Sequence, residues 1–119
     1  MTSNETPQAI LALLRVLQIS PKYHGHHYIA KSVQLVMENN ELLLDVTKKL
    51  YPMVAEIYGT RWTNVEHDMR TVINKCWKEG DHSLLEDIAG RELTKKPRTV
   101  DFIDILANFL LHHGGVQSP

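Results

Sequence analysis

Four polar side chains recur on one face of a predicted helix in the middle of the chain: Glu66, His67, Arg70 and Asn74. Carboxylate, imidazole, guanidinium and amide groups can each form hydrogen bonds with base edges or phosphates. Such a face is typical of a helix that enters a groove of a nucleic acid. An ordinary solvated helix surface explains the same pattern, and from spacing alone it is the more frequent case.

The helix that positions these groups is predicted over residues 63–78. Its apolar positions fall at i, i+4, i+7 and i+11, in Val65, Met69, Val72 and Cys76. This spacing forms one stripe, which must face a core and so turns the polar side chains outward. Thr63, with Glu66 three residues later, has the spacing of a capping box and predicts the start of the helix.

A second helix is predicted just before it, because Val54, Ile57 and Tyr58 have helical spacing. Gly59 should end that helix, since glycine adopts positive φ at low cost. Helix, short glycine turn and longer helix with a polar outer face is the layout of a helix-turn-helix, here at about 46–79. An ordinary helical hairpin remains the alternative. Pro52 predicts a kink or break within the first helix.

The rest of the chain also has helical patterns, with helices expected at about 6–18, 28–38, 83–89 and 99–113, and with residues 23–28 as a loop. The helix that contains Pro52 is expected to begin at Leu42 and to continue through Val46 and Leu50. No segment has the alternation of a strand. We therefore predict an all-α domain of about six helices over residues 7–114. Disordered tails are expected at 1–6 and 115–119.

The net charge of −1 counts against a strongly basic nucleic-acid binder. The cations are nevertheless grouped near the predicted helix-turn-helix and in a later connector. Those that could hold phosphates are Arg61, Lys75, Lys78, Lys95, Lys96 and Arg98. Such grouping can produce a basic face on a near-neutral protein, although a mixed surface is an equally good explanation.

Several classes of function find no support in the sequence. It has no nucleophile motif, phosphate-binding glycine loop or zincin motif, so we expect no enzyme activity. The histidines at 24, 26 and 27 have no evident carboxylate or thiolate partner, so we expect no metal, cofactor or small-molecule ligand. The single cysteine, Cys76, and the absence of a leader or membrane span favour the cytoplasm.

Several uncommon residues occur together in an order that is shared with a known protein family. They are Leu50-Tyr51-Pro52 with Ala55, Thr60, Val65-Glu66 with Arg70, and Trp77 with Gly80. Further matches are Gly25 with Tyr28, Glu41-Leu42-Leu43, Lys96-Pro97 and Phe102-Ile103. In these residues the chain resembles the C-terminal effector domain of stage zero sporulation protein A, the response regulator of endospore-forming bacteria. The resemblance extends from about residue 7 to residue 114.

The resemblance implies a six-helix, DNA-binding fold whose recognition helix enters the major groove of double-stranded DNA. In that family an Arg-x-Glu-Arg run contacts bases, and the matching positions here are Asn64, Glu66 and His67, with Arg70 also retained. The two missing arginines would remove bidentate contacts with guanine, at about 1–3 kcal/mol for each pair. Asn64 could instead prefer adenine, and Glu66 could accept from cytosine.

Two functions therefore remain open. The first is a sequence-specific transcriptional regulator with altered specificity, in which Asn64, Glu66, His67 and Arg70 read bases, with room for a homodimer on tandem sites. The second is a protein-interaction module that keeps the fold but has lost DNA reading, for example a modulator of a related regulator. The family's receiver domain is absent from this sequence, which fits either an excised domain or a stand-alone relative.

Overall fold

All regular structure in the computed structural model, which describes residues 5–113, is helical. Six α-helices occur in this range: α1 (Glu5–Val16), α2 (His24–Glu38), α3 (Tyr51–Tyr58), α4 (Trp62–Glu79), α5 (His82–Ala89) and α6 (Thr99–His113). A 3₁₀-helix, η1 (Asn40–Asp45), and a short π-helix, η2 (Val46–Leu50), connect α2 to α3. The predicted all-α fold is confirmed.

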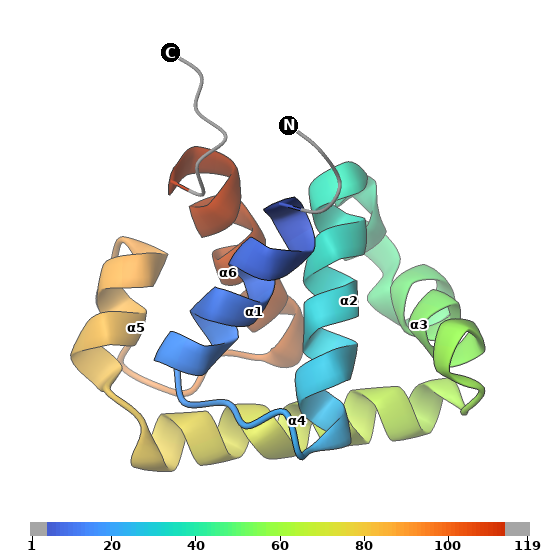
Figure 1. Cartoon of the computed structure of the whole chain (residues 1–119), viewed down its shortest axis with the longest axis horizontal. Helices are drawn as coiled ribbons and strands as arrows, with labels where there is room; N and C mark the ends of the chain where they lie inside the picture. The colour runs from blue at the N-terminus through green and yellow to red at the C-terminus, as the bar shows by residue number, and fades with distance from the viewer. Residues whose placement is uncertain (1–4, 114–119) are drawn as a thin grey trace.

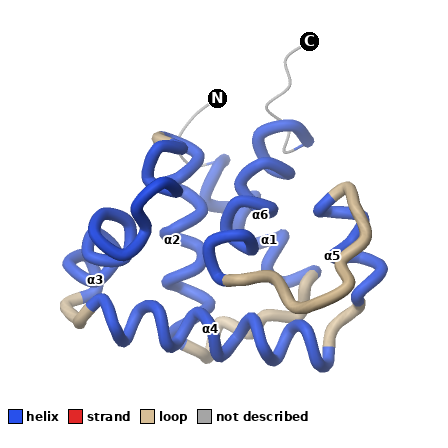
Figure 2. The backbone as a smooth tube through the Cα atoms, turned by 180° about the vertical axis from the view of Figure 1, so that it is seen from behind, coloured by secondary structure: helices blue, strands red, loops and turns tan. Residues whose placement is uncertain are grey.

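Helix α4 lies along one side of the molecule, and α1, α2 and α6 rise from it (Figures 1 and 2). The central element is α2, which packs against α1, α3, α4 and α6. Ile29 and Val33 of α2 and Phe102 of α6 are fully buried in the core that these helices share. Because the other helices all lie on one side of α4, its opposite side is left uncovered.

The crossing of α2 and α4 depends on Gly25. A Cβ atom at this position would lie 2.2 Å from the backbone oxygen of Asp68 in α4, closer than any side chain tolerates. This close contact explains why residues 23–28 are not the loop that the sequence predicted. Helix α2 begins at His24, so that its first turn, including His26, packs against the rest of the core.

Between α2 and α3 the chain changes its helical winding twice, from 3₁₀ to π to α. Pro52 lies in the first turn of α3, where a missing N–H removes no helical hydrogen bond. The break predicted at this proline therefore appears as the junction between η2 and α3. Buried Leu50 and Tyr51 anchor the junction in the core.

The turn of the helix-turn-helix follows α3. Gly59 has the left-handed conformation (φ 67°), which confirms its predicted role in ending α3. The predicted capping box is wrong: α4 begins at Trp62, one residue before Thr63, and its N-cap residue Arg61 makes no side-chain capping bond. Thr63 therefore lies inside the first turn, and its exposed side chain faces away from the core.

The disordered N-terminal tail predicted over residues 1–6 extends too far into the chain. Glu5 and Thr6 already belong to α1, a difference of the size that is usual at a helix end. The remainder of that tail, residues 1–4, and the predicted tail at 115–119 lie outside the described residues.

Candidate nucleic-acid interface

The two sides of α4 differ sharply in burial. The predicted apolar stripe is confirmed, because Val65, Met69, Val72 and Cys76 are all buried, together with Ile73. On the opposite side the exposed residues are Thr63, His67, Arg70, Thr71 and Lys78. In both ribbon views no other element covers this side (Figures 1 and 2). The polar side of α4 is therefore free to enter a groove.

The four predicted base-reading residues do not all share this outer ridge. Residues two apart on a helix are separated by about 200°, which places Asn64 and Glu66 on opposite flanks of α4. His67, which is exposed, lies between them on the ridge. The amide of Asn64 donates to the Thr60 hydroxyl across the turn, at 3.0 Å.

Glu66 and Arg70 are brought together one turn apart. Arg70 Nη1 lies 3.3 Å from Glu66 Oε2, and the side chains are 52% and 28% exposed. The guanidinium is held beside the carboxylate, which partly neutralises the positive charge of Arg70. Because Arg70 is half exposed, water screens its charge and the pair contributes little to stability. Arg70 can therefore exchange Glu66 for a base or a phosphate at small cost.

The six predicted phosphate-binding cations are all exposed, but they differ in their partners. Lys75 pairs with Glu79 at 3.1 Å, and Arg98 pairs with Asp101 at 2.8 Å. The hydrogen bond with Glu79 raises the pKa of Lys75. Lys96 donates to the Asn74 amide oxygen, which ties the connector between α5 and α6 to α4. Within residues 5–113, Arg61, Lys78 and Lys95 have no ion-pair or hydrogen-bond partner for their side chains.

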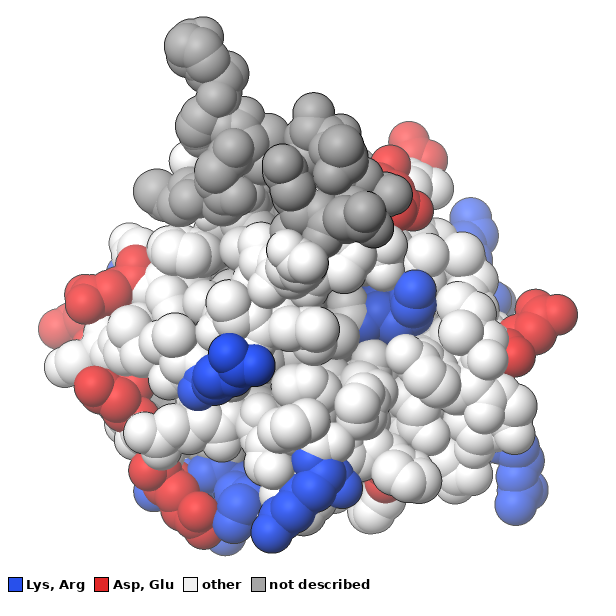
Figure 3. Space-filling view, viewed as in Figure 1, with Lys and Arg blue, Asp and Glu red and all other residues white. Residues whose placement is uncertain are grey.

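The surface charge is unevenly distributed. In the view of Figure 3, Lys and Arg side chains gather along the lower part of the molecule, where α4 lies in Figure 1. Asp and Glu side chains lie at the left, over α5 and the end of α4, and also at the right edge and the upper right. This partition places cations beside the exposed ridge of α4, while the net charge stays near zero.

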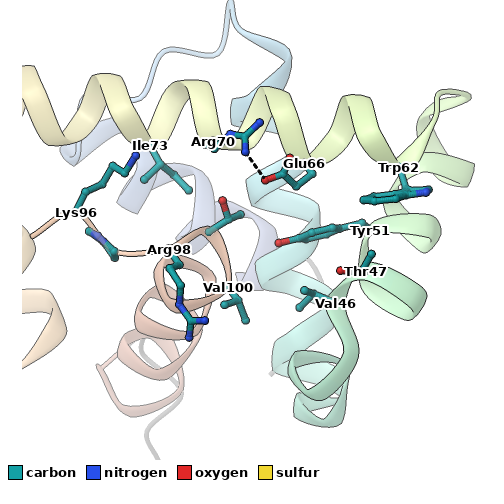
Figure 4. A pocket seen from close by; sticks show the side chains of 12 residues that line it. Val46, Thr47, Tyr51, Trp62, Glu66, Arg70, Ile73, Lys96, Arg98 and Val100 are labelled. Atoms are coloured by element: carbon teal, nitrogen blue, oxygen red, sulfur yellow. Dashed lines mark ion pairs between the residues drawn. The ribbon is translucent and has the colours of Figure 1, made fainter.

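A groove runs along the Glu66 flank of α4 and encloses about 540 Å³. Its walls come from α4, from the η2–α3 junction and from the connector that leads into α6 (Figure 4). Tyr51 lies at its floor, and burial, followed by the charge of Glu66, raises the pKa of this phenol to about 12. Tyr51 is therefore protonated and can donate a hydrogen bond at neutral pH.

Trp62 also lines this groove, and the sequence did not mark it as a site residue. Its indole is 40% exposed at the first position of α4. Placing the helix start at Thr63 left Trp62 in the turn. A start at Trp62 would have put it on the same flank as Glu66, because residues four apart share a face.

Two of the clustered histidines contact backbone carbonyl groups. His26 is buried with Nδ1 3.1 Å from the Ile19 carbonyl oxygen, and His27 contacts the Pro21 carbonyl oxygen at 2.8 Å. Among the described residues no group of three or more histidines, cysteines and carboxylates is placed to hold a metal ion. The same part of the chain has no helix long and apolar enough to cross a membrane.

Residues 10–110 match the family described as the sporulation initiation factor Spo0A C terminal. The chain belongs to this family. Spo0A C-terminal domains are non-enzymatic, DNA-binding effector domains of helix-turn-helix type. The predicted family, the fold class and the assignment as a non-enzyme are thereby confirmed, and membership implies DNA-binding transcription regulation.

Proposed function

We propose that this Spo0A-type domain is a sequence-specific transcriptional regulator that inserts α4 into the major groove and prefers a different DNA site from its relatives. The observation that carries the proposal is the uncovered ridge of α4, on which His67 and Arg70 are exposed. These two side chains, with Asn64 and Glu66 on the flanks, would read bases. In this proposal the chain acts in the cytoplasm.

The altered preference rests on two side-chain types. Asn64 and His67 stand where the resemblance places arginines, and neither can form the two parallel hydrogen bonds that a guanidinium makes with guanine. Asn64 can pair with adenine in the same bidentate manner once it releases Thr60. The site should therefore lose a guanine preference at two positions and gain an adenine preference at one.

The cations around α4 would bind the phosphate backbone of the DNA. Arg61, Lys78 and Lys95 have no intramolecular partner among the described side chains, and Lys96 has only a neutral one. Lys75 and Arg98 would first have to leave Glu79 and Asp101, which costs little because both pairs are exposed. Two copies on tandem sites would double these contacts, and the stoichiometry of the complex tests that arrangement.

The decisive experiment is selection of bound sequences from a random duplex pool, followed by titration of the selected site at several salt concentrations. A defined consensus and a steep loss of affinity with salt, at about 0.9 log units per log unit of salt for each phosphate neutralised, are expected. Failure to bind any duplex at low salt would exclude this function.

A second function is favoured by one observation, namely that three of the cations near α4 already face carboxylates: Arg70, Lys75 and Arg98. A domain with this balance could serve as a protein-interaction module that blocks a related regulator. If the chain binds no duplex but lowers the DNA affinity of a second Spo0A-type domain mixed with it, this alternative is selected.

A further inference from the structure

The groove beside α4 has a floor that DNA contacts would not reach. Tyr51 and Thr99 line it and are only 4% and 9% exposed, whereas the Arg70 and Arg98 side chains at its rim are 52% and 78% exposed. A duplex lying against the outer ridge of α4 would contact the rim. The recess below it, of about 540 Å³, falls within the range of about 300–1,000 Å³ that is typical of small-ligand sites.

Two residues that line this recess, Tyr51 and Thr99, have hydroxyl groups without a partner. Neither Tyr51 nor Thr99 makes a side-chain hydrogen bond within residues 5–113. In the same range no fully buried side-chain nitrogen or oxygen lacks a partner, so both hydroxyl oxygens have some access to solvent. Figure 4 shows the Tyr51 hydroxyl directed toward the middle of the groove, on the side of Glu66. Each hydroxyl can therefore donate a hydrogen bond only to a bound ligand or to water.

The two ends of the recess differ in chemistry. Tyr51 and Trp62 present aromatic rings at one end, and Lys96 and Arg98 lie at the other (Figure 4). Lys96 contacts only the neutral Asn74 amide, so its charge is not balanced by a carboxylate. The first turn of α6, which begins at Thr99, adds backbone N–H groups at the cationic end.

We propose that this recess binds a nucleoside monophosphate. The base would lie against Trp62 and Tyr51, because flat rings stack favourably on aromatic side chains. The phosphate would lie beside Lys96 and the Thr99 hydroxyl at the start of α6, and Arg98 would join them after exchanging the Asp101 carboxylate for the phosphate. Glu66, the single carboxylate among the lining residues, would accept a hydrogen bond from an amino group of the base or a ribose hydroxyl.

Binding at this site would oppose binding to DNA. Lys96 and Arg98 belong to both the recess and the proposed phosphate-binding set, so an occupied recess removes two cations from the DNA backbone. By linkage, DNA would weaken nucleotide binding by the same factor. This coupling rests on the DNA-binding function proposed above, whereas the nucleotide site itself does not.

The test is titration of the whole chain with AMP and with GMP, followed by calorimetry and by amide chemical shifts. Adenosine and inorganic phosphate serve as matched probes that each lack one half of the ligand. We expect saturable binding of at least one nucleotide, with shifts concentrated in residues 46–51, 62–73 and 96–100. The nucleotide should bind at least about tenfold more tightly than either half, since a hydrogen bond to a charged group is worth about a factor of ten or more.

Variants separate this site from non-specific attraction. Lys96→Gln should weaken nucleotide binding by about tenfold, and Tyr51→Phe, which removes only the hydroxyl, should weaken it several-fold. Arg15→Gln on α1, which does not line the groove, should leave it unchanged. The proposal is overturned if no probe binds saturably at 10 mM, a test concentration of about the millimolar affinity scale. It is also overturned if adenosine or phosphate binds as tightly as the nucleotide, or if Lys96→Gln and Arg15→Gln behave alike.

A competition experiment checks the coupling. Saturating nucleotide should reduce the affinity of the chain for its selected duplex, and Lys96→Gln should abolish most of this reduction. If duplex affinity is the same with and without bound nucleotide, the two ligands do not share their cations and the coupling is refuted. A chain that binds nucleotide but no duplex would refute the DNA function alone.

Discussion

In the proposed complex, Arg70 is one of the side chains of α4 that would gain a contact with DNA. It is half exposed on the outer ridge and is held only by the pair with Glu66, which is partly exposed. A guanidinium makes two parallel hydrogen bonds with guanine, which the Glu66 pair does not prevent. Loss of Arg70 should therefore affect recognition much more than folding.

We predict that Arg70→Ala weakens binding to the selected duplex by about 1–3 kcal/mol and relaxes the preference at one base pair. Binding to random duplex should fall much less. Competition titrations with single-base variants of the site measure both effects. Lys31→Ala on α2, a cation away from the groove and from the predicted contacts, is the control. If the affinities for the selected and the random duplex fall equally, Arg70 contacts the phosphate backbone of the DNA and not a base.

His26 makes stability depend on pH. It is 4% exposed, and desolvation lowers its pKa below the ordinary 6.5, with a smaller opposing effect from the Ile19 carbonyl. The unfolded chain therefore binds a proton at a higher pH than the folded chain does. The stabilisation is complete above pH 6.5 and is lost as the pH falls from 6.5 toward the folded-state pKa.

The corresponding measurement is urea unfolding at pH 7.5 and at pH 5.5, on the two sides of the unfolded-state pKa of about 6.5. The free energy of unfolding should be lower at the acidic pH. His26→Gln should reduce this difference, while Gln34→Ala, on the same helix but without a titrating group, should leave it unchanged. If the two variants have the same pH dependence, His26 is not the titrating group.

At the scale of the elements, the position of α4 depends on the contact with Gly25. Gly25→Ala would drive a Cβ into the Asp68 carbonyl, so α2 and α4 must separate. Overpacking of this kind costs about 1–3 kcal/mol. Gly59→Ala provides a comparison, because its Cβ would meet no atom within 4 Å and only its positive φ is strained. Left-handed backbone at a non-glycine residue costs about 1–2 kcal/mol.

The two glycine variants should therefore differ in what they disturb. Both should lower the free energy of unfolding, but only Gly25→Ala should shift amide signals on both sides of the α2–α4 crossing. Gly59→Ala should disturb the turn alone. Chemical denaturation and amide spectra of the two variants give the comparison, and widespread shifts in Gly59→Ala would contradict it.

Helix capping gives a second prediction at this scale. The Asp81 carboxylate accepts from the backbone N–H of Leu84 at 3.1 Å at the start of α5, whereas Thr63 makes no such bond in α4. Asp81→Ala should lower stability by about 0.5–2 kcal/mol, and Thr63→Ala should change it by less than about 0.5 kcal/mol. If chemical denaturation shows that both variants lose the same free energy of unfolding, Thr63 does act as an N-cap.

Local patterns predicted most of these elements, because each helix has its own apolar repeat. The stripe on α4 and the stop at Gly59 needed only neighbouring residues, and both were found. The start of α2 was missed because it depends on a long-range contact of Gly25 with α4. Lys75 and Glu79, four apart on a helix, could have been paired from sequence. The groove could not, since its walls come from three distant segments.

For the whole molecule, the central question is how a chain with a net charge of −1 would bind a polyanion. The arrangement supports a local answer, in which several cations lie along the side of the molecule that α4 forms (Figure 3), together with the three carboxylates of α4, Glu66, Asp68 and Glu79. Interactions between exposed charges fade beyond about 8–10 Å at physiological salt. Acidic groups on distant faces should therefore matter far less than the carboxylates that pair directly with the cations near α4.

Glu79 allows this argument to be tested. It pairs with Lys75 at 3.1 Å, is 64% exposed, and lies at the C-terminal end of α4, where a negative charge opposes the helix dipole. Glu79→Gln should release Lys75 without loss of stability. The affinity for duplex DNA should rise, and the slope of log affinity against log salt should steepen by about 0.9 if Lys75 then neutralises one more phosphate. Glu38→Gln, at the far end of α2, makes the same change in net charge and should leave the slope unaltered. If both variants raise the affinity equally, net charge rather than the local pairing near α4 controls association.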